Sequence, residues 1–310
     1  MSRTGARTSI AVAVCTYKRN GALKVLLRAL IACAERIRDR AAVGVALIDD
    51  TSEGQARAVA EEFADKFELG VVYRISGKQN ISIARNLALE TVLGIGDWIA
   101  MTDDDCEPPA EWLKALLDLQ QRTGADAVTG RMVRRVPEGS PRWITDEPFL
   151  ELGVEELSDG SEIPSAATFH TMISGSSLKA HPNIRFEPAI GVNGGEDMVF
   201  FRAARAAGLT IRFSRDGFVY ENEPPERATF GYQLYVHFWH GNSAALGCIE
   251  SGMKRSRILM HGGASLVRAV GRPLARLLRG KQPQLRYGLA QVLHATGKLL
   301  GSVGVRIEHR

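Results

Sequence analysis

The chain has 310 residues, of which 45% are hydrophobic and 24% charged. This is the composition of an ordinary globular protein, which excludes a disordered chain, a collagen and a coiled-coil rod, and the length suits two domains or one α/β domain with an extension. The net charge of +4 hides an asymmetry, because residues 251–310 contain 12 Lys and Arg against one acid, Glu308, whereas residues 1–250 contain 27 basic and 34 acidic residues.

The first hundred residues alternate short apolar runs with longer amphipathic segments, a pattern typical of strand–helix units that form a parallel sheet. The expected strands are residues 10–15, 43–48, 71–75 and 97–102. The expected helices are residues 22–38, 56–67 and 80–93, and a fourth helix over 111–121 follows two prolines that suit a first helical turn.

The middle of the chain is less regular. We expect a strand near 127–131, a long loop rich in Pro, Gly and acids over 136–165, and a strand over 168–178. A glycine-rich loop then leads into a helix that ends at Gly208, followed by strands near 210–213 and 217–220 and a helix near 229–246. The last sixty residues predict two basic amphipathic helices, 258–280 and 285–305.

The four cysteines are widely spaced and form neither a CxxC pair nor a Cys/His cluster, which is typical of reduced thiols in a cytosolic protein. The amino-terminal segment has an apolar run of only six residues, too short for a signal peptide. No apolar stretch reaches the roughly 18–20 residues that a membrane-spanning helix needs. We therefore expect a cytoplasmic protein.

Acidic residues follow two of the expected strands and open one expected helix. They are Asp49 and Asp50 after the second strand, Asp103, Asp104 and Asp105 after the fourth, and Asp197 after the glycine-rich loop. Ligands of open α/β sheets bind at the carboxyl ends of the strands. Acids in loops more often face solvent, but the shared position of these groups favours a binding site.

The run of three aspartates has the chemistry of a Mg²⁺ or Mn²⁺ site, because these cations take oxygen ligands and share them with substrate phosphates. Residues i and i+2 lie on one face of an extended chain. We therefore expect Asp103 and Asp105 to converge on one ligand and Asp104 to point elsewhere. The alternative is a solvated acidic turn.

Asp197 has two explanations. An aspartate in the first turn of a helix complements the helix dipole. Gly194, Gly195 and Glu196 favour a catalytic role, because glycines let the backbone approach a substrate and an adjacent carboxylate makes Asp197 a better proton acceptor.

Together and in this order, these segments resemble family 2 inverting glycosyltransferases with a GT-A fold. The matching segments are VAVCTYKRN, LIDDTSEG, NISIARNLAL, WIAMTDDDCEPPAEWL and GGEDMVFFRAARAAG, which span about residues 8–220. NISIARN, PRW at 141–143 and GGED followed by FF are similar to bacterial exopolysaccharide β-glucosyltransferases of the succinoglycan type.

The resemblance implies an α/β fold of GT-A type, with a mostly parallel central sheet flanked by helices. The catalytic domain would span residues 1–250, with a nucleotide-binding half over about 1–130 and an acceptor half over about 131–250. Residues 251–310 would form a basic helical extension.

The resemblance also implies roles for single residues. Asp197 matches the catalytic base, Asp49 the acceptor of a hydrogen bond from uracil, and Asp103 and Asp105 the DxD pair that touches the ribose and the metal. The residues expected against the nucleotide-sugar are Thr16, Tyr17, Arg19, Asp49, Asp50, Asn80, Arg85, Asp103 and Asp104. Without the resemblance, Asn80 is equally well explained as a helix cap and Arg85 as a surface ion pair.

The activity that the resemblance implies is transfer of one sugar from a UDP-sugar, with glucose suggested by the closer branch, to a lipid-linked oligosaccharide acceptor. It would invert the anomeric carbon, use Mg²⁺ or Mn²⁺, and serve exopolysaccharide or other surface polysaccharide synthesis at the inner face of the plasma membrane. The QxxRW motif of processive members is missing, which favours single-sugar addition. Candidates on the acceptor side are Glu196, Trp143 and His237, although the aromatic residues are equally well explained by packing.

The basic tail is expected to lie on an anionic membrane surface; the alternative is a helical cap that packs on the body or on a second subunit. A nucleic-acid partner is not expected, because no recognition motif is present and the body is acidic. Two other functions stay open: a non-catalytic scaffold that binds sugar or membrane, and a Mg²⁺-dependent phosphohydrolase. The position of the aspartate run after the fourth strand counts against the phosphohydrolase.

Overall fold

The computed structural model describes residues 7–151, 153–154, 156–192 and 194–307, and it consists of two compact units. Unit 1 contains the described residues of Met1–Val133, Leu152–Pro188 and Phe200–Glu221. Unit 2 contains those of Arg134–Glu151, Ala189–Val199 and Asn222–Arg310.

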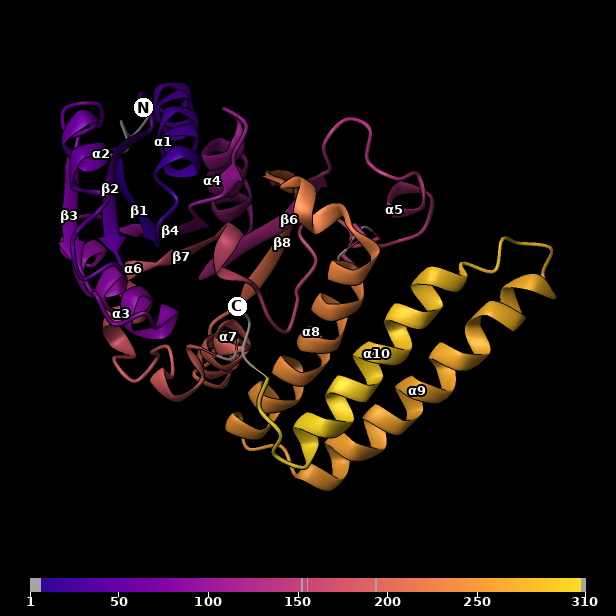
Figure 1. Ribbon diagram of the computed structural model, residues 1–310. Coiled ribbons are helices and arrows are strands. Elements are labelled where there is room, and N and C mark those ends of the chain that lie inside the picture. Colours follow the sequence, from indigo (N-terminus) through magenta and orange to yellow (C-terminus); the bar gives the residue numbers. More distant parts are fainter. Residues whose placement is uncertain (1–6, 152, 155, 193, 308–310) are drawn as a thin grey trace. The chain divides into compact units, whose positions relative to one another are not determined.

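Unit 1 is built on an eight-stranded sheet with the order β3-β2-β1-β4-β7-β6-β8-β5 (Figure 1). The strands are β1 (Thr8–Thr16), β2 (Ala41–Asp49), β3 (Val71–Ile75), β4 (Trp98–Asp103), β5 (Cys106–Glu107), β6 (Ala127–Arg135), β7 (Thr171–Ser174) and β8 (Ile211–Asn222). β3, β2, β1 and β4 pair in parallel, whereas β7 pairs antiparallel with β4 and β6, and β5 antiparallel with β8. The sheet is therefore mixed, with the expected parallel arrangement in its amino-terminal half.

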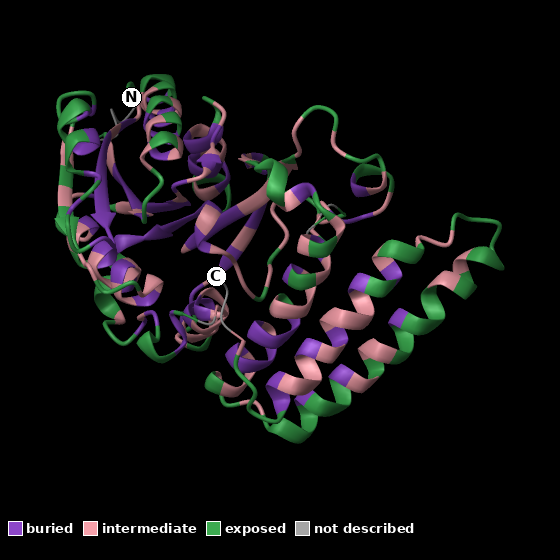
Figure 2. Ribbon diagram, in the orientation of Figure 1, coloured by how far each residue is buried: buried purple, intermediate pink, exposed green. Residues whose placement is uncertain are grey.

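The helices on this sheet are α1 (Asn20–Arg36), α2 (Arg57–Glu62), α3 (Ile81–Val92), α4 (Trp112–Thr123), α6 (Gly175–Ala180) and the second half of α7 (Glu196–Ala206). Side chains alternate between the faces of a strand. Accordingly, Ile10, Val12 and Val14 join one hydrophobic core with α1 and α4, and Ala11 and Ala13 join the other with α3. Because both faces are covered, most residues of the central strands β1, β2, β4 and β7 are buried (Figure 2).

Three expectations about the elements are wrong in part. The strand expected over 168–178 ends after β7, because the Ser174 hydroxyl accepts a hydrogen bond from the backbone N–H of Ser177 and caps α6. β8 is one long strand where two short ones were expected over 210–213 and 217–220. The loop expected over 136–165 contains a short helix, α5 (Trp143–Asp146).

Unit 2 contains three long helices, α8 (Phe230–Glu250), α9 (Arg255–Leu277) and α10 (Leu285–Ser302). α10 packs against both α8 and α9 (Figure 1). Its backbone closely approaches that of α8: a Cβ on Gly241 would lie 1.9 Å from the carbonyl oxygen of His294, and one on Gly297 2.0 Å from that of Phe238. α10 therefore forms part of the packed interior of unit 2.

Within the described part of the chain, none of the helices combines the length and apolar character needed to cross a membrane.

Candidate active site

The aspartate run occupies the turn between β4 and β5. Asp103 is the last residue of β4 and lies beside Cys15 of β1, and Cys106, the first residue of β5, pairs with Glu221 of β8. Asp104 and Asp105 form a turn between the two strands. The expectation that Asp103 and Asp105 lie on one face of an extended chain is therefore wrong, because the chain is no longer extended after Asp103.

Two arginines neutralise this turn. Arg85 of α3 pairs with Asp103 at 3.1 Å. Arg19, in the loop after β1, pairs with Asp105 at 2.7 Å and with Asp104 at 3.2 Å. These contacts bring together three segments that are far apart in the sequence, and they place cationic groups where an anionic ligand of the strand ends would bind.

Asp104 points into the protein. Its side chain is buried and accepts a hydrogen bond of 2.7 Å from the hydroxyl of Thr16, the last residue of β1. Burial raises the pKa of Asp104, although Thr16 and Arg19 oppose this shift. Asp104 thus fixes the end of β1 to the turn, whereas Tyr17, the next residue of the chain, is exposed.

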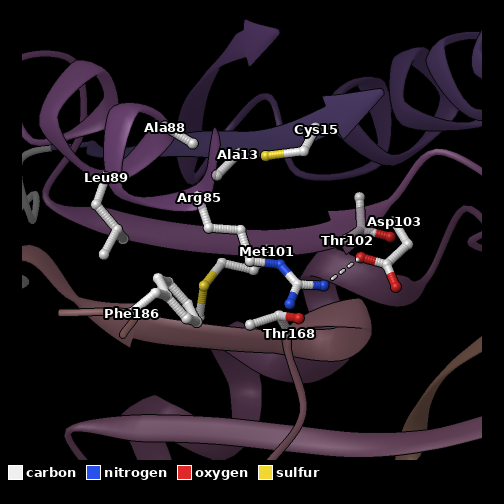
Figure 3. Close-up of a pocket in the computed structure, with 10 residues that line it drawn as sticks. All are labelled: Ala13, Cys15, Arg85, Ala88, Leu89, Met101, Thr102, Asp103, Thr168 and Phe186. Atoms are coloured by element: carbon white, nitrogen blue, oxygen red, sulfur yellow. Dashed lines mark hydrogen bonds and ion pairs between the residues drawn. The ribbon is translucent and has the colours of Figure 1, made fainter. Parts of the chain in front are cut away.

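A pocket lies beside the pair of Arg85 and Asp103 in unit 1 (Figure 3). The Arg85 guanidinium lies between Asp103 and the Phe186 ring, whose centroid is 5.7 Å away. Its side chain is only 12% exposed, so the alternative of a surface ion pair does not describe Arg85. The lining residues are Ala13, Cys15, Arg85, Ala88, Leu89, Met101, Thr102, Asp103, Thr168 and Phe186.

Cys15 places a free thiol on this pocket. Burial raises its pKa to about 12, and the favourable charge of Arg85 does not compensate for the lost solvation. The thiol is therefore neutral at physiological pH and contributes an apolar wall.

Asp49 is held by hydrogen bonds within the protein. Its carboxylate accepts from the backbone N–H and hydroxyl of Thr51 at 2.9 and 2.7 Å, from the backbone N–H of Ala56 at 2.7 Å and from the hydroxyl of Tyr73 at 2.8 Å. Burial acts to raise the pKa of Asp49, but these donors outweigh it and the pKa is lowered. In this structure Asp49 orders the loop after β2.

Asp50 orders a second loop in the same way. Its carboxylate accepts hydrogen bonds from the hydroxyl of Ser76 and from three consecutive backbone N–H groups, those of Lys78, Gln79 and Asn80. Gln79 has a positive φ of 50°, a strained conformation that the surrounding contacts maintain. The loop before α3 is thus preformed.

Asn80 caps α3, as the alternative explanation predicted. Its side-chain oxygen accepts a hydrogen bond of 3.2 Å from the backbone N–H of Ile83, and its amide nitrogen donates one of 2.9 Å to the carbonyl of Pro188. Capping does not exclude contact with a nucleotide, but it accounts for this residue by itself.

Asp197 lies in the first turn of α7, in unit 2, whereas all the candidates for nucleotide binding belong to unit 1. The two glycines before it have positive φ values of 79° and 96°. A Cβ on Gly194 would lie 2.7 Å from the Trp239 ring, and one on Gly195 would lie 2.9 Å from the carbonyl oxygen of Ser243. The two glycines therefore allow this loop to pack closely against α8. This packing explains the glycines without the approach of a substrate.

The acceptor-side candidates Trp143 and His237 meet in an aromatic cluster within unit 2. The Phe149 ring packs edge-on against both, with centroid distances of 5.0 Å to Trp143 and 5.6 Å to His237, and Phe230 and Tyr287 complete the group. Burial lowers the pKa of His237. Trp143 and His237 therefore have the packing role that was the alternative to acceptor binding. The third candidate, Glu196, is buried.

Sequence reasoning missed several residues of the pocket. Cys15 and Thr102 directly precede Thr16 and Asp103 at the ends of β1 and β4, so the rule that sites form at strand ends could have identified them. Thr168 begins the segment 168–178, whose small residues are typical of a strand close to a ligand, whereas Phe186 has no local signal, because it reaches the pocket from a later segment through long-range folding.

The carboxylates of Asp103 and Asp105 suit Mg²⁺ or Mn²⁺. Both are partly exposed oxygen donors, at 38% and 22%. Among the residues that the structure describes, no group of three or more His, Cys, Asp or Glu could hold a metal. Mg²⁺ commonly takes one or two carboxylates and completes its shell with water and substrate phosphates.

A mixed sheet with flanking helices agrees with the GT-A fold that the sequence led us to expect, and comparison with known proteins shows that the chain is a glycosyltransferase of this fold. Residues 11–181 match the sequence profile of the family described as "Glycosyl transferase family 2". The chain belongs to glycosyl transferase family 2 and is an enzyme of that family. A phosphohydrolase and a non-catalytic scaffold are therefore not supported.

Two curated relatives extend the match. The succinoglycan biosynthesis protein ExoM of Rhizobium meliloti is 31% identical over 302 residues, which cover 96% of this chain and 94% of the relative. The glucosyl-dolichyl phosphate glucuronosyltransferase of Haloferax volcanii is 22% identical over 250 residues, which cover 76% and 75% of the two chains.

Solved structures share the fold at low identity. S. aureus TarS 1-349 in complex with UDP-GlcNAc superposes with a TM-score of 0.55 at 14% identity, covering 96% of this chain and 92% of that one. The longer S. aureus TarS chain is matched over 39% of its length. GalNAc-T7 with UDP, GalNAc and Mn²⁺ superposes with a TM-score of 0.52 at 15% identity, covering 81% of this chain and 52% of that one.

Proposed function

We propose that this glycosyltransferase transfers a single hexose from a UDP-sugar to a lipid-linked oligosaccharide, and that this hexose is glucose. The reaction inverts the anomeric carbon and uses Mg²⁺ or Mn²⁺. The product would enter bacterial exopolysaccharide or another surface polysaccharide. The observation that carries the proposal is the near-complete match to a succinoglycan biosynthesis protein at 31% identity.

The donor side of the proposal rests on the two arginines at the aspartate turn in unit 1. Arg19 and Arg85 carry the donor groups that recognise phosphate oxygens, and they already pair with carboxylates at the end of β4 and in the turn after it. A nucleoside diphosphate would exchange these carboxylates for its own oxygens. UDP is the nucleotide in the complexes of TarS and GalNAc-T7, which have the same fold.

In the proposed reaction, an acceptor hydroxyl attacks the anomeric carbon from the face opposite the diphosphate. The new bond joins the acceptor oxygen to the anomeric carbon, the bond to the diphosphate oxygen breaks, and Asp197 takes the hydroxyl proton. An α-linked donor thereby gives a β-linked product. A divalent cation held by Asp103 and Asp105 would neutralise charge on the departing diphosphate, while Arg85 holds the diphosphate in place.

The name of one relative supports the proposal of a lipid-linked acceptor, and the name of the other supports the polysaccharide product. One relative is a biosynthesis protein for an exopolysaccharide, and the other acts on a glucosyl-dolichyl phosphate, a sugar joined to a lipid by phosphate. A donor made in the cytoplasm and an acceptor anchored in lipid meet at the inner face of the plasma membrane, which is where we place the reaction.

A donor screen tests the proposal. Purified protein is incubated with Mn²⁺, a lipid extract of exopolysaccharide-producing bacteria, and UDP-glucose, UDP-galactose, UDP-glucuronate or UDP-N-acetylglucosamine, each labelled in the sugar. We expect label in the lipid fraction with UDP-glucose and its loss with chelator. Label from another donor alone would overturn the choice of glucose, and transfer unaffected by chelator would overturn the metal.

Asp197→Asn tests the base. We expect transfer to fall at least 10³-fold while UDP binding, measured by calorimetry, is retained, because the amide keeps the shape but cannot accept the proton. Asp216→Asn, which changes an exposed aspartate of β8, is the matched control and should transfer at the wild-type rate. Wild-type transfer by Asp197→Asn would remove Asp197 from the mechanism.

A further inference from the structure

The outer face of α9 is apolar and uncovered. Seven large hydrophobic side chains of this helix and the turn after it are between 48% and 80% exposed, namely Leu259, Met260, Val267, Val270, Leu274, Leu277 and Leu278. Figure 2 shows exposed residues along almost the whole length of this helix. An exposed apolar patch of this length on a folded protein is the mark of an interaction surface.

The seven residues form one stripe. At 3.6 residues per turn they fall within an arc of about 100° on the helix. The buried residues of α9, Ile258, Gly262 and Ala269, lie on another side, where the helix packs on α10. The stripe is therefore additional to the face that holds α9 in unit 2.

A row of basic side chains runs beside the stripe. Arg257 and Arg268 are eleven residues apart, about three helical turns, so they lie on one side of α9, and Arg279 follows in the turn beyond. All three are exposed. Residues 251–307 contain no Asp or Glu, so this surface carries no acid to offset the arginines.

We propose that the outer face of α9 binds an anionic lipid surface, with the apolar stripe inserted at the level of the headgroups and the arginine row on the lipid phosphates. An apolar stripe flanked by Lys and Arg is the arrangement of helices that lie in the plane of a membrane interface. The proposal is independent of the donor, the metal and the acceptor suggested above.

Charge favours lipid over a second copy of this chain. A symmetric dimer through this face would place the same patch of both subunits in contact, and with it two rows of arginines without acids between them. An anionic bilayer offers the opposite charge together with an apolar interior.

The two tail helices therefore have different tasks. α10 packs between α8 and α9, and at its end the Asn242 side chain of α8 donates a hydrogen bond of 3.0 Å to the carbonyl of Val305. Removing residues 251–310 would expose the face of α8 that α10 covers, including the fully buried Ala245. Substitutions on the outer face of α9 in the full chain are the cleaner test.

The experiment is flotation of the full-length protein with vesicles of phosphatidylcholine, with or without 30% phosphatidylglycerol. One variant replaces the centre of the stripe, Val267→Ser, Val270→Ser and Leu274→Ser; a second replaces the row, Arg257→Gln, Arg268→Gln and Arg279→Gln. The matched control replaces exposed apolar residues of unit 1, Val25→Ser and Val72→Ser.

We expect the wild type and the control to float with anionic vesicles, and the stripe variant to bind at least tenfold more weakly. The row variant should lose the preference for anionic over neutral vesicles. Circular dichroism and thermal unfolding like those of the wild type show that the variants are folded. Unchanged flotation of the stripe variant would overturn the proposal, as would a wild-type dimer in light scattering that the stripe variant converts to a monomer.

Discussion

From the sequence alone, Arg85 is explained equally well as a contact to the nucleotide-sugar and as a surface ion pair. Its guanidinium lies against Asp103 on one side and the Phe186 ring on the other, and its side chain is mostly buried. A flat, forked cation fills that place through directed hydrogen bonds and ring contact together. The geometry of the group matters here as well as its charge.

Arg85→Lys tests this point, because lysine keeps the charge but loses the fork. We expect KM for the nucleotide-sugar to rise at least tenfold, since only one contact to the diphosphate can be kept. Steady-state kinetics over a range of donor concentrations would measure the change. Arg38→Lys, at an exposed position after α1, is the control and should leave KM unchanged.

His170 predicts how stability depends on pH. Burial lowers its pKa to about 4 from an ordinary value of 6.5, so between these values the unfolded chain takes up a proton that the folded chain does not. Stability should therefore fall as the pH falls, by about 2 kcal/mol from this residue between pH 7.5 and 5. Burial lowers the pKa of His237 and His294 too, which acts in the same direction.

Urea unfolding at pH 7.5 and 5.0 measures this effect. The drop in unfolding free energy should be smaller in His170→Asn by about the 2 kcal/mol that one such histidine supplies. His261→Asn, on the exposed side of α9, should behave like the wild type. An equal drop in wild type and His170→Asn would show that His170 is not the titrating group.

At the scale of elements, the sequence predicts best where one local signal decides. The apolar runs predicted the strands β1, β2 and β4, and the three aspartates were expected at the end of β4, although as an extended segment and not as a turn. It fails where distant partners decide. The donors to Asp49 include Tyr73, 24 residues away, and those to Asp50 come from a loop that follows β3. No local sequence pattern distinguishes an aspartate that holds loops by hydrogen bonds from one that binds a ligand.

The loop before α7 shows the same limit, because its glycines are explained only by α8. In Gly195→Ala the new Cβ would meet the carbonyl oxygen of Ser243 at 2.9 Å, a backbone atom that cannot rotate away, in addition to the strain of a φ of 96°. We expect a loss of about 2–4 kcal/mol in unfolding free energy and a lower kcat, because Asp197 lies two residues further on.

Gly208→Ala separates strain from contact. Gly208 ends α7 with a φ of 93°, but a Cβ there would meet nothing within 4 Å. This variant should lose only the cost of the left-handed conformation, about 1–2 kcal/mol, and keep the wild-type kcat. Equal losses of unfolding free energy in Gly195→Ala and Gly208→Ala would mean that the loop before α7 moves away from α8 and so relieves the contact. Urea unfolding and single-turnover transfer give the two quantities.

At the scale of the whole molecule, acidic and basic residues are unevenly distributed along the chain, and so are the proposed functions. The first 250 residues are net acidic and contain the site proposed for the donor, whereas the last sixty are strongly basic. An acidic part is repelled by the anionic surface that attracts the basic part. Salt should therefore weaken vesicle binding.

Cation and nucleotide should stabilise the whole chain together. UDP with Mn²⁺ at a hundred times its Kd should add about 2.7 kcal/mol of stability, seen as a rise in Tm of several degrees. UDP with chelator should give a much smaller rise, because Asp103 and Asp105 then have no cation through which to hold the diphosphate. A double variant, Asp103→Asn with Asp105→Asn, should lose the Mn²⁺-dependent part. The same rise with and without Mn²⁺ would contradict the metal assignment.

The pairing of β5 with β8 has a consequence for the order in which the enzyme is made. Cys106 follows the aspartates at once, yet its partner Glu221 is synthesised 115 residues later. A nascent chain that has reached the end of α4 already contains all three aspartates and both arginines. It does not yet contain β8, the strand with which β5 pairs. The turn is therefore completed only when β8 leaves the ribosome, and prematurely terminated chains lack a finished site.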